Sequence, residues 1–150
     1  MQIEGKFTVK APIQKLWDAL FDVQILASCL PGAEKVEKID DKTYEVIMKQ
    51  KVGPIKVKLY SKNVLTVVQP PNHIELEGEG EDMTKLGHIK QKVTLDMKEL
   101  DNGEVEVSYL MDVNMVGKLA MFGDRIMRSK AKDVEEELTG SLREKQKNLG

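Results

Sequence analysis

Apolar and polar residues alternate along most of the chain, beginning within the first ten positions. The stretch IEGKFTVK predicts a strand, and Pro12 follows it at a position that suits the first turn of a helix. Apolar residues then recur at helical spacing, which predicts a short helix. A second short helix is expected from about Val23 to Ser28, and Pro31-Gly32 ends it.

From this point to about Val116 the pattern is that of strands and turns. The predicted strands cover residues 34–39, 43–52, 55–68, 73–81, 88–100 and 104–116. The breaks between them hold the usual turn residues, at 40–42, 53–54, 70–72, around 87, and at 101–103. Consecutive strands joined by such short turns indicate an antiparallel sheet.

The turn at Asp101–Gly103 can be assigned from the alternation on both sides of it. A two-residue loop would put the apolar faces of the two strands on opposite sides of the sheet. A three-residue loop with a left-handed glycine sets Leu95 against Tyr109 and Val93 against Met111, so that both apolar faces coincide. We therefore predict the three-residue form.

After Gly117 the apolar period changes to that of a helix, predicted from Lys118 to near Lys145. Its apolar stripe consists of Leu119, Phe122, Ile126, Val134, Leu138 and Leu142. The order strand, two short helices, six strands, long helix predicts an α+β domain spanning residues 1–150. In it, a curved seven-stranded antiparallel sheet wraps around the C-terminal helix, which is a helix-grip fold.

A long helix laid across a curved sheet leaves a gap unless large side chains fill it. The chain has seven aromatic residues, three Phe, three Tyr and one Trp, so that Leu, Val and Met must do most of the filling. An apolar cavity for an elongated apolar ligand is one hypothesis, and a closed core is the other. The candidate cavity residues are Val36, Val46, Met48, Val57, Leu59, Leu76, Gln91, Val93, Leu95, Val107, Tyr109, Met111, Met115, Leu119, Phe122 and Ile126.

Composition and charge narrow the class of protein. The 23 basic and 25 acidic residues give no net field that would attract nucleic acid. The single cysteine, Cys29, excludes an internal disulfide and is consistent with a reducing compartment. The longest uncharged stretch, Val23 to Ala33, is shorter than the about 20 apolar residues of a membrane-spanning helix. We expect a cytoplasmic protein that touches a membrane only from its surface.

Residues 118–132 form a basic stretch. They contain Lys118, Arg125, Arg128, Lys130 and Lys132 against Asp124, a net charge of +4. Either this is a solvated helix face, or Lys118, Met121, Arg125 and Arg128 contact anionic headgroups or an acidic partner.

Catalytic and metal signatures are weak. His73 and His88 lie at or near strand starts, far apart and without the ligand spacing that a metal site needs. We expect no tightly bound cofactor and no metal. Tyr109 and Gln91 are the polar candidates on the inner face, where each would hydrogen-bond a carbonyl or headgroup; a core tyrosine is the alternative for Tyr109.

Five motifs distributed over nearly the whole chain carry a family resemblance. They are F.V.AP...LW..L.D over Phe7–Asp22, LPGAE over Leu30–Glu34, VGPIK over Val52–Lys56, LEGEG over Leu76–Gly80 and VGKLAMFGDR over Val116–Arg125. The sequence resembles the G subunit family of carbon monoxide dehydrogenase, within the START-like helix-grip (SRPBCC) superfamily.

The resemblance implies an accessory protein that binds a quinone or lipid-like molecule and links a molybdenum hydroxylase to the membrane. By the same resemblance, Pro31, Gly32, Gly53 and Pro54 form the lip of the pocket. The segment REKQKNLG after Leu142 is polar, so we expect transient membrane docking rather than a stable anchor.

Three classes of function remain open from the sequence. The first is a non-catalytic carrier of an apolar ligand. The second is a small cyclase or isomerase of the same fold, which needs a buried acid or base in the cavity. The third is an interaction module with a closed core, whose basic helix face is the working surface.

Overall fold

The computed structural model describes residues 1–52 and 54–149, with side chains described as far as residue 145. The strands are β1 (Gln2–Lys10), β2 (Ala33–Asp40), β3 (Thr43–Val52), β4 (Ile55–Gln69), β5 (His73–Asp82), β6 (Gly87–Glu99) and β7 (Glu104–Gly117). The helices are α1 (Ile13–Leu20), α2 (Val23–Cys29), the 3-10 helix η1 (Lys118–Phe122) and α3 (Gly123–Leu149).

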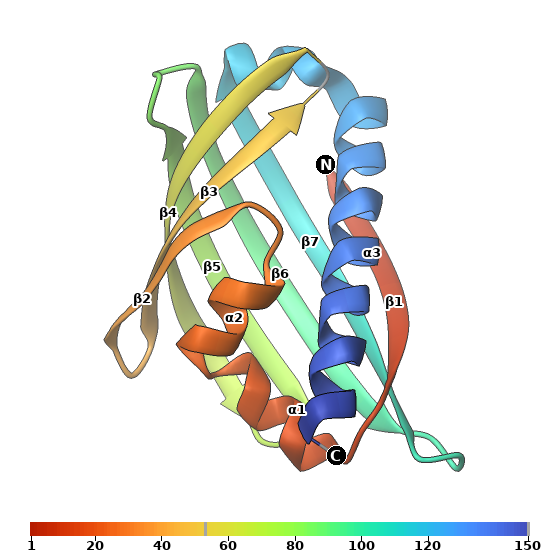
Figure 1. The fold of residues 1–150 in the computed structure, drawn as a ribbon. Coiled ribbons are helices and arrows are strands. Elements are labelled where there is room, and N and C mark those ends of the chain that lie inside the picture. Colours follow the sequence, from red (N-terminus) through yellow and green to blue (C-terminus); the bar gives the residue numbers. More distant parts are fainter. Residues whose placement is uncertain (53, 150) are drawn as a thin grey trace.

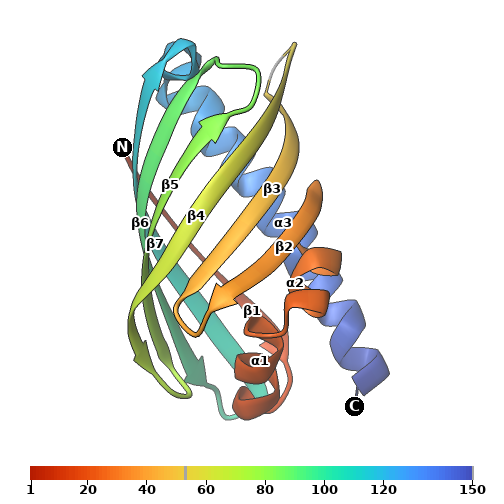
Figure 2. The same cartoon turned by 90° about the vertical axis from the view of Figure 1, so that its left-hand side faces the viewer.

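The seven strands form one antiparallel sheet in the order β1-β7-β6-β5-β4-β3-β2. Strands β2 to β7 follow one another as hairpins, and β1 joins the far edge beside β7. The sheet is strongly curved, and all three α-helices lie on its concave side (Figures 1 and 2). The predicted helix-grip α+β fold is confirmed.

The register of the β6–β7 hairpin is the predicted one. Leu95 pairs with Tyr109 and Val93 with Met111. Gly103 has φ +80°, a left-handed conformation that a glycine adopts without steric cost, and it closes the three-residue loop. The apolar faces of both strands therefore point to the concave side.

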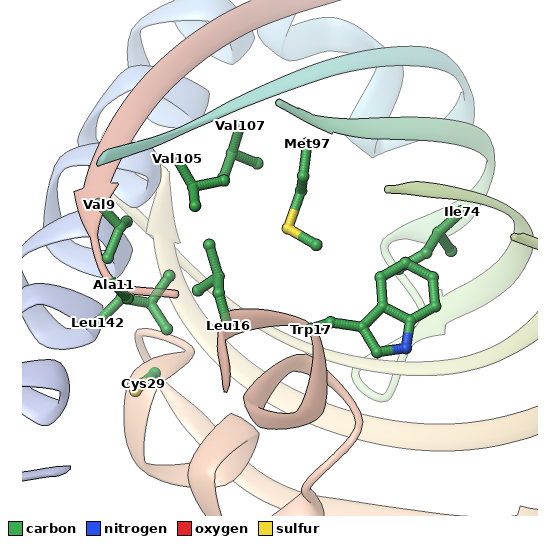
Figure 3. Packing of buried hydrophobic residues seen from close by; sticks show 10 residues of the cluster. All are labelled: Val9, Ala11, Leu16, Trp17, Cys29, Ile74, Met97, Val105, Val107 and Leu142. Atoms are coloured by element: carbon green, nitrogen blue, oxygen red, sulfur yellow. The ribbon is translucent and has the colours of Figure 1, made fainter. Parts of the chain in front are cut away.

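The main core lies where α1 meets β1 and the β6–β7 hairpin. Leu16 and Val9 are 0% exposed, and Leu16 and Trp17 point from α1 toward the strands (Figure 3). Leu142 of α3 and Cys29 of α2 complete this cluster from the other two helices. Burying one such aliphatic side chain contributes about 1.5–3 kcal/mol, so this cluster fixes both short helices on the sheet.

Helix α3 is held over β1, at one edge of the sheet. Tyr109 donates a hydrogen bond from its hydroxyl to Glu135 Oε1 at 2.6 Å, and Arg143 donates to the Thr8 carbonyl through Nε at 3.1 Å and Nη2 at 2.9 Å. Gly5 makes the first contact possible, because a Cβ there would collide with both the Tyr109 hydroxyl and the Glu135 carboxylate. The long helix thus leans toward one side of the sheet.

The predicted start of the C-terminal helix is wrong. The sequence pattern suggested a helix from Lys118, but residues 118–122 form a 3-10 turn and α3 begins at Gly123. The physical reason is the φ of +72° at Gly123, which interrupts the right-handed path. Asp124, and not Lys118, lies in the first turn of the α-helix, where a carboxylate is favourable.

The end of the sheet at η1 is closed by a second apolar cluster. Val52, Val57 and Leu119 are buried there. Asp82 braces the adjacent β5–β6 turn: its carboxylate accepts hydrogen bonds from the backbone N–H groups of Lys58, Thr84 and Leu86 and from the Thr84 hydroxyl. This end is therefore tightly packed and ordered by a buried carboxylate.

Candidate functional site

A cavity of about 310 Å³ lies between the middle of the sheet and the α1–α2 pair. Its lining residues are Leu20, Phe21, Leu26, Leu30, Val36, Tyr44, Val46, Met48, Ser61, Asn63, Leu65, Ile74, Leu76, Gln91, Val93, Leu95 and Met111. No residue among them is charged, and most are aliphatic. The volume is at the lower end of the about 300–1,000 Å³ that ligand pockets span.

Helix α2 supplies part of the cavity wall and begins at a well-formed cap. Asp22 Oδ1 accepts hydrogen bonds from the N–H groups of Gln24 at 2.9 Å and Ile25 at 3.2 Å, which satisfies two donors that the helix leaves open. This cap sets the direction of the helix. Leu26 and Leu30 then face the sheet across the cavity.

The Pro31-Gly32 turn is fastened to β3. Gln50 donates from Nε2 to the Pro31 carbonyl at 2.6 Å, and the Lys49 N–H donates to the Gly32 carbonyl at 2.8 Å. Gly32 has φ +74°, and a Cβ there would collide with the Lys49 carbonyl, so that only glycine fits this approach. Leu30, the residue before this turn, lines the cavity, which places Pro31 and Gly32 beside its wall.

Glu34 adds an ionic contact to the same turn. Its carboxylate lies 2.8 Å from Lys49 Nζ and 3.2 Å from Lys58 Nζ. The hydrogen bonds with these two lysines lower the pKa of Glu34 below its usual value. Of the other two predicted lip residues, Pro54 is exposed in the β3–β4 turn, away from the cavity lining, and Gly53 lies outside the described residues.

Eight of the predicted cavity residues line the cavity. They are Val36, Val46, Met48, Leu76, Gln91, Val93, Leu95 and Met111. They come from β2, β3, β5, β6 and β7, and the period-2 alternation places them together on the concave face.

The other eight predicted residues lie outside the lining, and their placement corrects the prediction. Val57, Leu59, Met115, Leu119 and Phe122 belong to the closed cluster at the η1 end, Val107 is in the main core, and Ile126 is 44% exposed. The eighth, Tyr109, is bonded to Glu135. Burial and this carboxylate raise the pKa of Tyr109, so its hydroxyl stays protonated.

These corrections have one cause. The sequence pattern suggested a cavity under the C-terminal helix, but no described residue of α3 lines it. The contacts of Tyr109, Thr8 and Leu142 hold α3 over β1 instead. The middle strands face α1 and α2, which are too short to cover them.

The lining also contains residues that the sequence analysis missed. They are Leu20, Phe21, Leu26, Leu30, Tyr44, Ser61, Asn63, Leu65 and Ile74. Ser61 and Asn63 could have been found, because they occupy alternate positions of β4 together with Val57 and Leu59 and so share their face. The helix residues could not, because their facing depends on how α1 and α2 dock.

Exposed apolar side chains gather at the η1 end of the molecule. Eight large apolar residues are exposed in the described part of the chain. Five of them belong to segments that meet around the closed cluster: Ile55, Met83, Val116, Met121 and Ile126. We call them the apolar tip; Met121 is 82% exposed. The β3–β4 turn, the β5–β6 turn and η1 lie together at this end, opposite α1 (Figure 2).

Cations accompany the apolar tip. Its neighbours along the chain include Lys56, Lys85, Lys118, Arg125 and Arg128, and all of these are exposed. The predicted contact residues Lys118, Met121, Arg125 and Arg128 are thus part of a larger surface. Its apolar members come from β4, the β5–β6 turn, β7, η1 and α3, a grouping that the linear sequence does not reveal.

The described part of the chain contains neither a candidate metal site nor a candidate membrane-spanning helix. Within it, no group of three or more His, Cys, Asp and Glu side chains could hold a metal ion. Its helices include none that is both long and apolar enough to cross a bilayer.

The fold is shared with solved START-like proteins. A START superfamily protein from Mycobacterium smegmatis superimposes with a TM-score of 0.76 at 10% identity, covering 99% of each chain. The aromatase/cyclase ZhuI from Streptomyces sp. R1128 has a TM-score of 0.69 at 15% identity, covering 98% of this chain and 93% of that one. A conserved protein from Geobacillus kaustophilus reaches 0.90 at 21% identity, covering 99% of this chain and 96% of the other.

Within that class the family is defined by sequence. The CoxG family, named for the G subunit of carbon monoxide dehydrogenase, matches residues 5–146. The chain belongs to this family. A search of curated protein sequences gave no match.

Proposed function

We propose that this protein is a non-catalytic carrier that holds a quinone or lipid-like molecule in the cavity between the sheet and the α1–α2 pair. The observation that carries the proposal is the cavity lining, whose apolar side chains come from six strands, β2 to β7, and from the α1–α2 pair. Apolar cavities of this kind accept apolar guests. At about 310 Å³, the cavity would take the headgroup and first part of an elongated ligand.

A binding role is favoured over a catalytic one by the chemistry of the wall. A cyclase or isomerase needs an acid or base placed against its substrate. The polar lining residues are Tyr44, Ser61, Asn63 and Gln91. They include no Asp, Glu, His, Lys or Cys, the side chains that most often act as general acid or base. The structural similarity to an aromatase/cyclase therefore concerns the fold only, and the lining of the cavity favours a carrier role.

Family membership supports an accessory role beside a membrane-linked molybdenum hydroxylase of the carbon monoxide dehydrogenase type. Such a role would take an apolar ligand between a bilayer and a protein partner. It requires the carrier to bind transiently to the membrane surface, at the inner face if the protein is cytoplasmic.

The apolar tip supports transient binding to a membrane. Its five apolar side chains would enter the headgroup region, while Lys118, Arg125 and Arg128 would contact anionic lipids. Each such cation contributes about 1 kcal/mol near an anionic surface, and the contribution falls with salt. We infer docking that is reversible and dependent on anionic lipid.

Native mass spectrometry combined with solvent extraction tests the carrier role. The purified protein, or protein incubated with prenylquinones and phospholipids, should hold one apolar ligand. Met111→Trp fills the cavity from β7 and should abolish ligand retention. Leu110→Trp is the matched control, because the neighbouring side chain is exposed on the opposite face of the strand and retention should persist.

Two outcomes would count against the carrier role. One is a folded Met111→Trp protein that retains ligand as the wild type does. The other is a wild-type protein that takes up neither quinone nor lipid, which would favour an interaction module with the basic helix face as its working surface.

Vesicle sedimentation tests the docking surface. Vesicles of phosphatidylcholine with phosphatidylglycerol should bind the protein, and those of phosphatidylcholine alone should bind it weakly. Met121→Asp with Arg125→Glu should reduce binding at least tenfold. Ile39→Asp changes an exposed apolar residue of β2, remote from the tip, and should leave binding unchanged. Equal binding by all three proteins would disprove docking through the tip.

A further inference from the structure

A row of polar side chains interrupts the apolar wall of the cavity. Strand pairing places Asn63 opposite Gly78, and Gly78 opposite Gln91. Ser61 lies two residues before Asn63 on the same face of β4, and its Oγ accepts a hydrogen bond from Asn63 Nδ2 at 3.1 Å. Ser61, Asn63 and Gln91 all line the cavity, and we call them the polar row.

Gly78 brings the two amides of the polar row together. An ideal Cβ at Gly78 would lie 2.5 Å from Asn63 Oδ1 and 3.2 Å from Gln91 Nε2. A side chain on β5 would therefore push the amides apart. Without one, the amides of β4 and β6 lean over the intervening strand toward the same place.

The polar row has hydrogen-bonding capacity to spare. Among the residues whose side chains are described, 1–52 and 54–145, none forms a hydrogen bond with the Gln91 side-chain amide, and none donates one to Asn63 Oδ1. Both amide side chains are half-buried, with their free polar atoms at the cavity wall. The surrounding wall consists of Val46, Leu76, Val93 and other apolar residues, so the partner of these amides is whatever fills the cavity, either water or a ligand.

The charge of that partner follows from the lining. No lysine, arginine or histidine whose side chain is described lines the cavity, so a carboxylate or phosphate there would lie in apolar surroundings without a counter-charge. Burial of an unpaired charge is costly. A neutral carbonyl or hydroxyl carries no such cost, and a primary amide can donate to the first and accept from the second.

We propose that the polar row is the headgroup site of the cavity and selects uncharged ligands that bear a carbonyl or hydroxyl group. This inference rests on the proposed carrier function and specifies which of its ligands are accepted. Gln91 Nε2 donates to a ligand carbonyl, and Asn63 Oδ1 accepts from a ligand hydroxyl. Quinones, quinols and long-chain alcohols meet these requirements, whereas fatty acid anions do not.

A pair of ring probes isolates the contribution of the carbonyl groups. The probes are 2,3-dimethyl-1,4-naphthoquinone and 2,3-dimethylnaphthalene, which differ only in the two carbonyls. Binding of each is measured by titration calorimetry and by quenching of Trp17, the single tryptophan, which packs in the core beside the cavity residue Ile74. The quantity compared is the ratio of the two dissociation constants.

The test variant is Asn63→Leu with Gln91→Leu, which keeps side-chain size and removes both amides. It should weaken quinone binding about tenfold relative to naphthalene binding. Leu110→Met changes an exposed residue on the opposite face of β7, outside the cavity lining, and should leave the ratio unchanged. Gln91→Leu alone, expected to shift the ratio about threefold, serves if the double variant does not fold.

A second pair of probes tests the selection against charge. Wild-type protein should bind 1-decanol at least tenfold more tightly than decanoate at pH 8. An unchanged quinone-to-naphthalene ratio in the folded variants would overturn the assignment of the headgroup site. Equal affinity for decanol and decanoate would overturn the selection of neutral ligands. Failure of the wild type to bind any of the four probes would instead remove the carrier function.

Discussion

The two sides of the concave face carry similar aliphatic residues in different surroundings. On the β1–β7 side, Val9 and Val105 are 0% and 1% exposed. On the β3–β6 side, Val46 and Val93 are only half-buried and line the cavity. The strands are alike in alternation and pairing, so the difference comes from the helices. Helices α1 and α3 cover the first side, whereas the end of α1 and the short helix α2 face the second across the cavity.

In this fold, coverage by helices rather than residue type separates core from cavity. The main core gains its stability from dense contacts on all sides. The cavity wall lacks partner atoms on its inner side, so its residues contribute less to folding and remain available to a ligand.

The largest effect should come from deleting equal side chains on the two sides. Leu16→Ala removes a fully buried residue of the main core and should lower the free energy of unfolding by about 3–4 kcal/mol. Leu76→Ala enlarges a space that already exists and should cost about 1 kcal/mol. Urea unfolding measures both. Equal losses would mean that the wall is packed as tightly as the core.

A smaller effect is expected where α3 is held to the covered side. Gly5→Ala places a methyl group against the Tyr109 hydroxyl and Glu135, and should destabilise the protein by about 2–3 kcal/mol. Gly140→Ala is the matched control in α3, because nothing lies within 4 Å of a Cβ there. It should stabilise the helix by about 0.5–1 kcal/mol. A harmless Gly5→Ala would show that α3 is free to shift over the sheet.

The smallest of the three effects concerns the closed end near η1. Burial opposes ionisation of Asp82, but its hydrogen bonds from Thr84, Lys58 and Leu86 outweigh this and lower its pKa below the usual value. Asp82→Asn should cost about 1–2 kcal/mol at pH 7, because buried donors lose their acceptor.

The pH dependence of this effect has a definite sign. Because the folded state lowers the pKa, Asp82 contributes its full stability above the unfolded value of about 3.9 and loses it as the pH falls through the folded value. The difference between wild type and Asp82→Asn in urea unfolding should therefore shrink below about pH 4. Asp101→Asn, in an exposed turn, should match the wild type throughout. A difference that stays constant into acid would exclude an ionised Asp82.

Much of the fold is readable from local patterns. The Leu95–Tyr109 register follows from alternation and one glycine, since a slip by one residue would turn every apolar side chain outward. The start of α3 does not follow in this way. Its apolar stripe continues through Leu119 and Phe122, and only the left-handed φ of Gly123 separates the two segments.

The cavity was harder to predict because it depends on docking. Alternation placed Val46, Met48 and Val93 on the inner face, but it placed Val57 and Leu119 there equally. Which of these residues meet a helix is decided by contacts between distant segments. Tyr109, for example, is drawn to Glu135 and away from the cavity.

Polar residues of the inner face posed a separate difficulty. Ser61 and Asn63 continue the face of β4 that begins with Val57 and Leu59. A serine or asparagine in a strand is more often exposed than buried, so residue type alone argues against an inward position. Only the strand's alternation, followed through its polar members, indicates that both line the cavity.

The cavity also gives the protein a particular mechanical property. Unfolding eliminates internal void, so hydrostatic pressure favours the unfolded state in proportion to the void that disappears. The residues that line the cavity, whose volume is about 310 Å³, should therefore be compressed more readily than the main core. A guest that fills this space would stiffen the β3–β6 side of the sheet and make the loaded carrier more resistant to pressure, with little change on the β1–β7 side.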